Sequence, residues 1–380
     1  MKKHLIAAAV AGAFAVPVMA QVTVSGAIDV SALRSSTFTA GPTAAAAGNS
    51  TKIEQAGMDS GWTTSVLRFT ATEDLGGGLK VTGIISSLFA AGQTVGQRER
   101  LIRLDGGFGR VEFGQFGNTI NGYNAYAWSG TNATAGNVDV GGFDFIVGTL
   151  GTTPTRAAAS GLTATANAVG TYEFQGNMIE YTTPVIGGFS ASLGLGKNTR
   201  DNDGTNFENK ANTSQETVRV NYSAGPLNVS AAHGKRRTDV EGTAAAKTQA
   251  KGSITWVGAS YNFGPAFLSF AHGDRTDKSS TGADALATFS DVKVNSVALR
   301  IPLGATTLHA STYQGTDKRT ATVADDDRDL KGYQIGAQYA LSKRTFVYAA
   351  MGQNENKIKT GANTNNAKLK GHSLGISHSF

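Results

Sequence analysis

The chain has 380 residues, no cysteine and a formal net charge of +6 at pH 7. Without cysteine it can form neither a disulfide bond nor a catalytic thiolate, and no run of lysine or arginine forms a patch of the kind that binds nucleic acid. Beyond the first twenty residues, no stretch approaches the run of about eighteen apolar residues that indicates a transmembrane helix.

Residues 1–20 (MKKHLIAAAVAGAFAVPVMA) predict a secretory signal peptide. They contain a lysine-bearing start, an apolar segment at 5–16 that is too short to span a bilayer, and a small-residue cleavage site before Gln21. The alternative, a retained N-terminal anchor helix, fits this pattern less well. We therefore predict an exported mature chain of residues 21–380, which forms a single domain because no linker or change of composition marks a boundary within it.

From Gln21 onward, segments of about ten residues alternate apolar and polar side chains and are bounded by turn residues, as β-strands are. The expected strands number sixteen and lie near 22–33, 62–72, 79–90, 97–105, 109–115, 177–183, 189–196, 215–222, 226–233, 252–261, 266–272, 292–301, 306–313, 332–340, 345–353 and 369–380. None of the seven prolines interrupts one of them, which agrees with the exclusion of proline from strand ladders.

Short and long connections alternate along the chain. Seven tight turns lie at 74–78, 105–109, 184–188, 223–226, 262–265, 302–305 and 340–344. The other connections are polar and mostly long, at 34–61, 116–176, 197–214, 234–251, 273–291, 314–331 and 354–367, and only 91–96 is short. Seven tight turns and eight loops are what sixteen up-and-down strands require.

This arrangement predicts an all-β fold, a sixteen-stranded antiparallel transmembrane β-barrel with short periplasmic turns and long extracellular loops. Lipid requires such closure, because an open sheet edge would leave backbone groups unsatisfied. Aromatic residues gather at the expected short-turn rim, where a membrane girdle belongs: Tyr181, Phe189, Tyr222, Tyr261, Phe263, Tyr339 and Phe380. The alternative is a soluble β-sandwich or propeller, which would need more large apolar residues or visible blade repeats.

Seven stretches carry a family resemblance and follow one another along almost the whole mature chain: VTVSGAIDV (22–30), TEDLGGGLK (72–80), GGFGRVEFGQ (106–115), NMIEYTTPVIGGF (177–189), GASYNFGP (258–265), YALSKRTFVY (339–348) and LGISHSF (374–380). On these motifs the sequence resembles the general porins of β-proteobacteria, the trimeric Gram-negative porin family that includes neisserial and Burkholderia-type porins. YALSKRT together with the terminal phenylalanine is the most specific part.

The resemblance implies a homotrimer and a third loop, here 116–176, that folds into the pore. It also implies that the terminal Phe380 is an assembly signal, read by the outer-membrane assembly machinery. The sequence departs from the family where Val66 and Thr70 stand in place of frequent arginines, and where Gln115 stands in place of another at the start of the third loop. These departures thin the arginine-rich constriction and argue against strong anion selectivity.

Strand phase identifies the side chains that point into the lumen, opposite the outward apolar row. Leu67 and Phe69 point to lipid, for example, so Arg68 between them points inward. By this reasoning the pore-lining basic residues are Arg68, Arg219, Arg300, Lys80 and Arg110, and the pore-lining acidic residues are Asp29, Glu112 and Glu180. In the constriction loop we expect Gln115, Asp139, Asp144 and Glu173, with the three acids as an opposing wall.

For each inward arginine the alternative is a pair with a nearby acid, which would cancel its effect on the pore. Two further arginines are weaker candidates. Arg34 is out of phase with Asp29 at a strand end, and Arg103 lies close to a turn and to the expected subunit interface.

A pore acts without covalent chemistry, through the diameter, charge and hydration of a water-filled path. We predict an outer-membrane diffusion porin of a Gram-negative bacterium that passes small hydrophilic solutes and ions with a weak preference for anions, and needs no cofactor or metal. The alternatives are a substrate-specific channel for organic acids and, because no catalytic constellation stands out, a less well supported barrel enzyme. The expected partners are two further copies of the chain, outer-membrane lipid and lipopolysaccharide, and the assembly machinery, but not nucleic acid.

Overall fold

The computed structural model describes residues 21–40, 49–57, 62–89, 96–117, 119–127, 174–200, 210–241, 248–281, 287–318, 326–360 and 363–380. The predictions for the signal peptide at 1–20 and for Asp139, Asp144 and Glu173 fall outside these residues. Within the described ranges, no helix is both long and apolar enough to cross a membrane.

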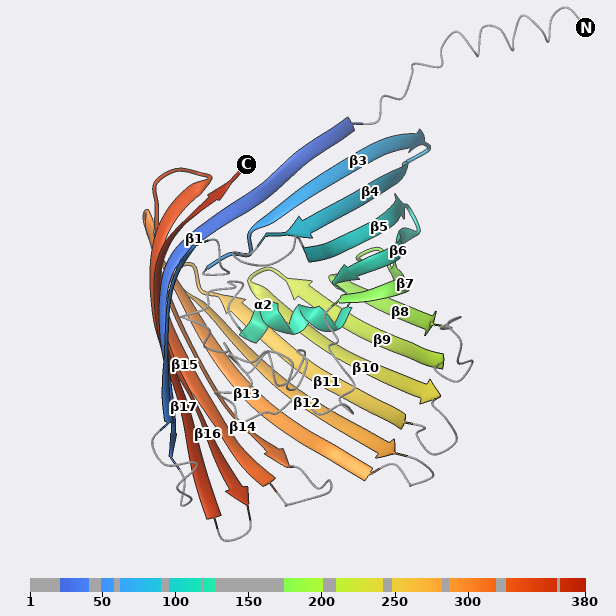
Figure 1. Cartoon of the computed structure of the whole chain (residues 1–380). Coiled ribbons are helices and arrows are strands. Elements are labelled where there is room, and N and C mark those ends of the chain that lie inside the picture. Colours follow the sequence, from blue (N-terminus) through green and yellow to red (C-terminus); the bar gives the residue numbers. More distant parts are fainter. Residues whose placement is uncertain are drawn as a thin grey trace, which may run out of the picture.

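Nearly all of the described chain is β-structure, and its strands form one antiparallel sheet (Figure 1). The strands are β1 (Gln21–Ala40), β2 (Asn49–Gly57), β3 (Val66–Gly76), β4 (Leu79–Leu88), β5 (Gly96–Gly106), β6 (Gly109–Gly117), β7 (Phe174–Thr182), β8 (Phe189–Arg200), β9 (Lys210–Ala224), β10 (Leu227–Glu241), β11 (Thr248–Asn262), β12 (Phe267–Thr281), β13 (Ala287–Leu303), β14 (Thr306–Lys318), β15 (Asp326–Ala340), β16 (Thr345–Thr360) and β17 (Asn363–Ser379). The helical elements of the described residues are the 3-10 helix η1 (Thr119–Tyr123) and the α-helix α2 (Asn124–Ala127).

The sheet closes on itself through β1. One edge of β1 pairs with β17 over residues 27–40. The other edge pairs with β3 at residues 21–27 and with β2 at residues 31–39. Because β2 and β3 share one position beside β1, the seventeen strands occupy sixteen positions in the ring. This arrangement confirms the predicted sixteen-stranded antiparallel barrel and leaves no sheet edge open to lipid.

The strand β2 corrects the sequence-based expectation, which places all of 34–61 in a loop. Its residues NSTKIEQAG lack a regular row of large apolar side chains. Pairing with the overhanging half of β1 makes the segment a strand, with Arg34 opposite Glu54 for example. Other strands also extend farther toward the long loops than hydrophobic alternation shows, because pairing continues beyond the apolar band.

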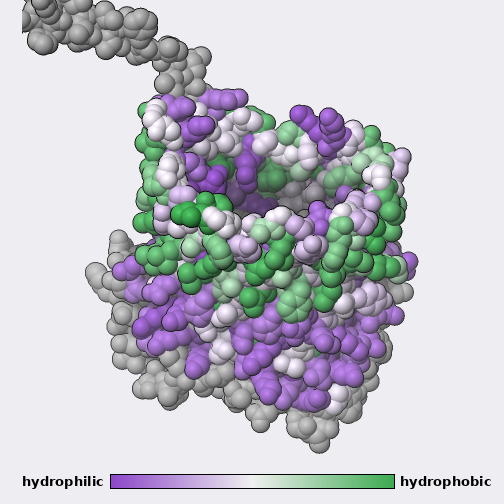
Figure 2. All heavy atoms as spheres, turned by 180° about the vertical axis from the view of Figure 1, so that it is seen from behind, coloured by the Kyte–Doolittle hydropathy of each residue, from purple (hydrophilic) through white to green (hydrophobic). Residues whose placement is uncertain are grey.

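A band of apolar side chains crosses the face of the barrel seen in Figure 2, with a hydrophilic zone on its long-loop side. Strand alternation produces this band. On β11, for example, Ile254 and Trp256 are buried inside, whereas Val257 is 42% exposed outside. A continuous apolar belt is unusual on a soluble protein but matches the hydrocarbon layer of a bilayer.

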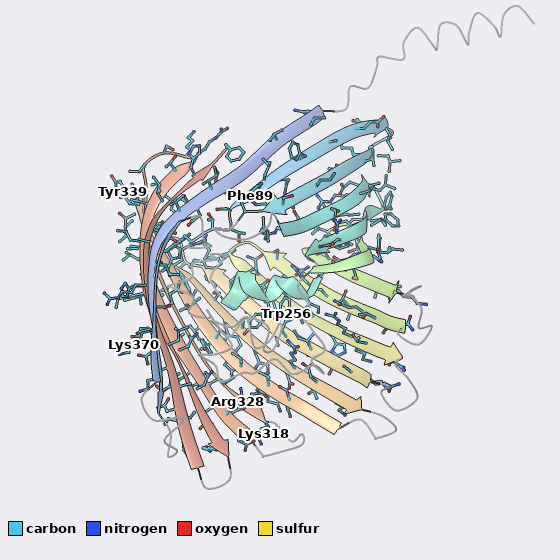
Figure 3. The ribbon with its side chains drawn as sticks, in the orientation of Figure 1. Phe89, Trp256, Lys318, Arg328, Tyr339 and Lys370 are labelled. Atoms are coloured by element: carbon cyan, nitrogen blue, oxygen red, sulfur yellow. The ribbon has the colours of Figure 1, made fainter. Side chains whose placement is uncertain are left out.

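Aromatic side chains mark the short-turn rim of the band. The ring centroids of Phe189 and Tyr222 lie 4.5 Å apart, and those of Tyr261 and Phe263 lie 4.6 Å apart. Tyr339 lies on the outside near the same rim (Figure 3) and is 51% exposed. This placement fits the girdle expected at a membrane interface, where an amphipathic ring contacts both lipid and water.

The last residue takes part in barrel closure. The N–H of Phe380 donates to the carbonyl of Gly26, and the N–H of Gly26 donates to the carbonyl of Phe380, both at 3.1 Å. The Phe380 ring lies over Gly26, where a Cβ atom would come within 2.7 Å of it. The chain therefore ends in register with its own first strand.

The largest buried apolar cluster lies inside the barrel, where η1 and α2 contact strands between β8 and β13. It consists of Ile120, Tyr123, Tyr126, Ala127, Ala232, Ile254, Trp256, Ala271, Val292, Val294, Tyr313 and Leu330. The first turns of the 116–176 connection therefore lie within the lumen and not outside it.

Candidate pore site

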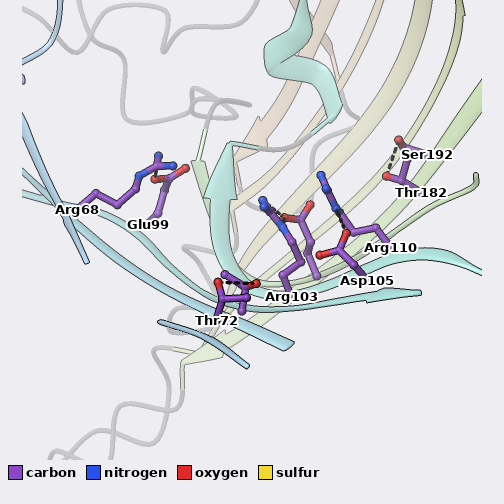
Figure 4. A network of polar contacts seen from close by, with 10 residues as sticks. Arg68, Thr72, Glu99, Arg103, Asp105, Arg110, Thr182 and Ser192 are labelled. Carbon is purple, nitrogen blue, oxygen red and sulfur yellow. Dashed lines mark hydrogen bonds and ion pairs between the residues drawn. The ribbon is translucent and has the colours of Figure 1, made fainter. Parts of the chain in front are cut away.

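Three arginine–carboxylate pairs lie on the inner wall of β3–β6 (Figure 4). Arg68 contacts Glu99, Arg103 Nη2 lies 2.6 Å from Glu112 Oε1, and Arg110 Nε lies 2.7 Å from Asp105 Oδ1. Their inward direction follows from their sequence neighbours, because Ile102 and Phe113 are 59% and 46% exposed on the outer face.

In each of these pairs the arginine is more exposed than the carboxylate. The exposed fractions of the two side chains are 39% and 16% for Arg68–Glu99, 27% and 11% for Arg103–Glu112, and 44% and 33% for Arg110–Asp105. The hydroxyl of Ser86 donates to Glu99 Oε2 at 3.0 Å and helps to hold that carboxylate against the wall. A solute in the lumen therefore meets more guanidinium than carboxylate surface, although each pair is formally neutral.

Glu112 and Glu180 are direct cross-strand neighbours on β6 and β7, and they are 9% and 7% exposed. Two like charges in this position repel each other. Arg103 pairs with Glu112, and the charge of Arg219 acts on Glu180. The two acids are thus enclosed between two arginines, and they present little charge to the lumen.

Trp256, on β11, anchors the docked segment 119–127. Its indole Nε1 donates to the carbonyl of Ile120 at 2.9 Å, and its side chain is fully buried. The rings of Tyr123 and Tyr126 pack on it at centroid distances of 6.2 and 6.0 Å. Figure 3 shows Trp256 beside α2, where the segment narrows the lumen.

The wall of β11 and β12 also fits the backbone of this segment. A Cβ atom on Gly258 would lie 2.3 Å from the side chain of Tyr126, so only glycine allows the observed approach. The hydroxyl of Ser269 donates to the carbonyl of Tyr126 at 2.6 Å. These contacts hold the start of the loop in one defined position on the inner wall, as a fixed constriction requires.

Arg219, on β9, lies beneath the docked segment and not in the free lumen. Its Nε donates to Asn221 Oδ1 at 2.7 Å and to Ser230 Oγ at 3.1 Å. Its guanidinium carbon lies 6.0 Å from the ring centroid of Trp256. A Cβ atom on Gly122 would come within 2.5 Å of Arg219 Nη1, so η1 covers this side chain. Arg219 therefore supports the loop directly. It does not contact solutes in the lumen and acts on them only through its electrostatic field.

Tyr126 lies in the loop helix α2, outside the spanning strands. Burial raises the pKa of Tyr126, and the positive charge of Arg219 opposes this rise only in part. The phenol is therefore protonated at neutral pH and adds no negative charge to the constriction.

Arg300 and Lys80 lie on strands at positions close to the short-turn rim. The guanidinium of Arg300, on β13, stacks 4.6 Å from the ring centroid of Phe267, and its cross-strand neighbour on β14 is His309. Lys80, on β4, is exposed and is the cross-strand neighbour of Asp105. These cations lie toward the periplasmic mouth, away from the docked segment.

Asp29 is fully buried and holds the segment before β3 against the inner wall. Its Oδ2 accepts the backbone N–H groups of Trp62 at 3.3 Å and Thr63 at 3.0 Å, and its Oδ1 accepts the hydroxyl of Tyr348 at 2.5 Å. The rings of Trp62 and Tyr348 pack with their centroids 5.3 Å apart. Because these hydrogen bonds occupy the carboxylate, it is not available to solutes in the pore. It acts instead as a latch, a contact that joins β1, this segment and β16.

Residues 7–359 match a family model that describes Gram-negative porins. The chain belongs to the Gram-negative porin family. The porin is thus an outer-membrane protein that works as a diffusion channel.

Two known outer-membrane porins are similar to this porin. Outer membrane porin protein 32 of Delftia acidovorans is 27% identical over 378 residues, with 94% of this chain and 90% of the relative covered. An outer membrane porin protein of Bordetella pertussis is 25% identical over 347 residues, with 81% of this chain and 80% of the relative covered. A solved anion-selective porin from Comamonas acidovorans shares the fold, at a TM-score of 0.63 and 21% identity over 95% of this chain and 100% of that chain.

In the porin, Gln115 lies in β6 and not in the inserted loop, which corrects its expected position. Its side chain shares the outer face with Phe113, and its Oε1 accepts a hydrogen bond from Arg100 Nη2 at 2.9 Å. The reason is that β6 continues to Gly117, past an irregularity in its pairing with β7. The chain turns into the lumen only after this strand has ended.

For two inward arginines of the porin, the sequence pattern does not predict the position on the inner wall that the structure shows. Arg103 lies on the lumen wall despite its proximity to a turn, and its outward neighbour Ile102 is the signal that could have placed it. Arg275 lies in a stretch expected to be a loop, yet it is fully buried on β12, with its Nη2 2.8 Å from Asp277 Oδ2. Its strand lacks a row of large apolar side chains at that height, so alternation of hydrophobicity cannot reveal it.

Proposed function

We propose that the porin is a general diffusion channel for small hydrophilic solutes and that it weakly prefers anions. The unequal exposure within the three arginine–carboxylate pairs carries this proposal, because the cation of each pair is the partner nearer to water. The name of the Comamonas acidovorans porin, an anion-selective channel, supports the same sign. The kinship with channels also favours passive diffusion over catalysis.

The preference is expected to be weak for a physical reason. Two unit charges 4 Å apart in water interact by only about 1 kcal/mol, and salt at 0.1 M screens charges beyond about 10 Å. Each guanidinium also has a carboxylate beside it. The inner wall can therefore bias the ions that pass, but it cannot exclude one sign.

Arg68→Ala tests the sign of the preference. The substitution removes the more exposed charge and leaves Glu99 unpaired at the wall, so the anion-to-cation permeability ratio is expected to fall by about twofold. The measurement is the reversal potential of the purified protein in a planar bilayer under a salt gradient.

Arg100→Ala is the matched control, since it removes the same charge from the outer face of a neighbouring strand and should leave the reversal potential unchanged. A cation-selective wild type would contradict the anion preference. Saturable block of the current by an organic acid would instead indicate a substrate-specific channel.

We further propose that the porin assembles as a homotrimer. The Arg100–Gln115 hydrogen bond lies on the outer face beside Ile102 and Phe113, and this supports a covered surface there. A charged side chain in contact with lipid is costly, whereas a neighbouring subunit can shield it.

We propose that Phe380 is an assembly signal read by the outer-membrane machinery, in addition to closing the barrel. Phe380→Ala is expected to remove most of the folded trimer from the outer membrane, because the terminal ring is lost. The same variant should still refold in detergent, since the backbone pair with Gly26 needs no side chain. Folded trimer is measured as the heat-modifiable band on a denaturing gel.

Phe263→Ala is the control for this prediction, because it removes another exposed aromatic from the same rim. Wild-type amounts of Phe380→Ala trimer in the membrane would contradict the signal. Equal loss in the membrane and in refolding would reduce the role of Phe380 to barrel closure.

A further inference from the structure

Arg300, on β13, is held differently from four other inward arginines of the barrel. The three arginines of the β3–β6 wall each contact a carboxylate, and Arg219 is hydrogen-bonded and covered by η1. For the guanidinium of Arg300, the described residues provide neither a carboxylate partner nor a hydrogen-bond acceptor. Its contact is instead the ring of Phe267, whose centroid lies 4.6 Å from the guanidinium carbon.

Strand alternation places both side chains of this stack on the inner wall. On β12, Leu268 and Phe270 are 41% and 43% exposed on the outer face, so Phe267 points inward together with the buried Ser269. Arg300 is the cross-strand neighbour of Phe267 and shares its face of the sheet. Both side chains of the stack are half-buried, and solutes in the lumen can therefore reach them.

The stack lies next to the docked segment 119–127, on its periplasmic side. The hydroxyl of Ser269 donates to the carbonyl of Tyr126 in that segment, and α2 contacts β12 and β13. Phe267 is two residues nearer than Ser269 to the short turn that joins β11 and β12. A solute that has passed the docked segment toward the periplasm therefore meets the stack of Phe267 and Arg300 next.

The neighbour of Arg300 on its other side does not occupy the guanidinium either. This neighbour is His309, on β14. Its ring packs edge-on against Trp62, with the two ring centroids 5.0 Å apart and the planes at 72°. Neither ring nitrogen of His309 has a hydrogen-bond partner among the described residues. The N–H groups of Arg300 therefore remain available to a solute.

The chemistry of this stack favours one class of solute. A guanidinium that stacks on a ring with one face still presents its N–H groups at the edge, in its own plane. A carboxylate fits that edge because it accepts two parallel hydrogen bonds. An aromatic group attached to the carboxylate then lies near the ring of Phe267, and two aromatic rings pack more favourably than their apolar area alone predicts. A saturated ring of the same size lacks this additional attraction.

We propose that Arg300 and Phe267 form a weak binding subsite for aromatic carboxylates on the periplasmic side of the docked segment. The subsite favours the passage of these solutes over that of saturated carboxylates of the same size. An exposed charge pair strengthens binding by no more than about fivefold, so the subsite biases passage without saturating the channel. This inference rests on the proposed diffusion function and adds a favoured class of solute to it.

The test compares benzoate with cyclohexanecarboxylate, two anions of similar size and equal charge. The purified full mature chain is inserted into a planar bilayer with the potassium salt of one acid on each side, at pH 8, where both carboxyl groups are ionised. The zero-current potential gives the ratio of the two permeabilities. For the wild type, benzoate is expected to be about threefold more permeant because of the additional ring contact.

Two variants should lose this preference and two matched controls should keep it. Phe267→Leu retains an apolar side chain but lacks the ring, and Arg300→Gln no longer holds the carboxylate beside the ring, so both should pass the two acids equally. Phe270→Leu removes a ring from the outer face of the same strand, and Lys80→Gln removes a cation near the same rim whose cross-strand neighbour is Asp105. The heat-modifiable band and the conductance in potassium chloride show that each variant is folded and open.

The outcomes separate the subsite from the channel function. Equal permeability of the two acids through an open wild-type channel would overturn the subsite and leave the diffusion function standing. A preference for benzoate that persists in Phe267→Leu or Arg300→Gln, or that is lost in Phe270→Leu or Lys80→Gln, would also overturn the subsite. Absence of conductance in potassium chloride would instead overturn the diffusion function, and the subsite with it.

Discussion

Trp256→Ala is expected to free the segment 119–127 from the inner wall and to raise both the mean conductance and the current noise of the porin. Removal of a buried tryptophan side chain costs about 3–5 kcal/mol. Here that loss falls on the docking of η1 and α2, because Ile120, Tyr123 and Tyr126 are the groups that contact the indole. The hydrogen bonds that remain, from Ser269 to the carbonyl of Tyr126 and between Tyr123 and Ser296, do not hold the start of the segment at Ile120.

The barrel itself should survive this substitution. Strand pairing uses the backbone of Trp256, opposite Ala232 on one side and Gly273 on the other, and the side chain contributes nothing to those ladders. The variant should therefore keep its heat-modifiable band while its channel properties change. Single-channel recording in a planar bilayer measures both conductance and noise.

Trp256→Phe separates the two contributions of the side chain. The phenyl ring keeps most of the packing on Tyr123 and Tyr126 but loses the hydrogen bond to Ile120, which is worth about 1 kcal/mol. Its conductance should lie between those of the wild type and Trp256→Ala. Wild-type conductance and noise in Trp256→Ala would show that the docked segment does not set the constriction.

Asp29→Ala is expected to have the largest effect on stability. The substitution leaves the Tyr348 hydroxyl and the N–H groups of Trp62 and Thr63 without their acceptor in a buried site. Unsatisfied buried donors cost about 1–3 kcal/mol each, and partial rearrangement limits the expected total to about 3–5 kcal/mol. Urea titration of the folded band, at constant detergent concentration, measures the loss.

Tyr348→Phe removes one donor and leaves the carboxylate with its two N–H partners. Its expected cost is about 1.5–3 kcal/mol, because the lost hydrogen bond ends on a charged group. The double variant Asp29→Ala/Tyr348→Phe should be more stable than the sum of the single effects predicts, since both changes break the same bond.

Ser35→Ala serves as the control for this latch, because Ser35 is buried on the same face of β1. It should change stability by less than about 1 kcal/mol. Additive effects of Asp29→Ala and Tyr348→Phe, or a loss in Asp29→Ala no greater than in Ser35→Ala, would show that the carboxylate does not act as a latch.

The barrel was largely predictable because its main signal is local. Alternation of apolar and polar residues gives the strands and the side of each strand that meets lipid, and the alternation of turn lengths gives the number of hairpins. The same signal fails in β2 and in the outer part of β12, where both faces carry polar residues. Arg275 was missed for this reason, since nothing in its neighbourhood of the sequence distinguishes a polar strand from a polar loop.

The roles of individual inward residues depend on tertiary contacts. Strand phase gives only the direction of each side chain and does not describe these contacts. Arg68 and Arg219 both follow from strand phase as inward arginines, yet Arg68 lies at the lumen surface beside Glu99 and Arg219 lies under η1. Asp29 is inward by the same rule, but its carboxylate accepts a hydrogen bond from Tyr348, which is 319 residues away in the sequence. Which inward charge meets water is decided by the segments that fold over the wall.

The sequence by itself determined that this protein is a closed antiparallel barrel with one face for lipid and one for water. It could do so because side-chain direction in a strand repeats every second residue and needs no partner to be known. Only the tertiary structure decided where the loop segment docks and which inward arginine it covers. Those features depend on register and on packing between distant residues. The roles of Trp256 as an anchor and of Arg219 as a support for the loop therefore follow only from the closed sheet.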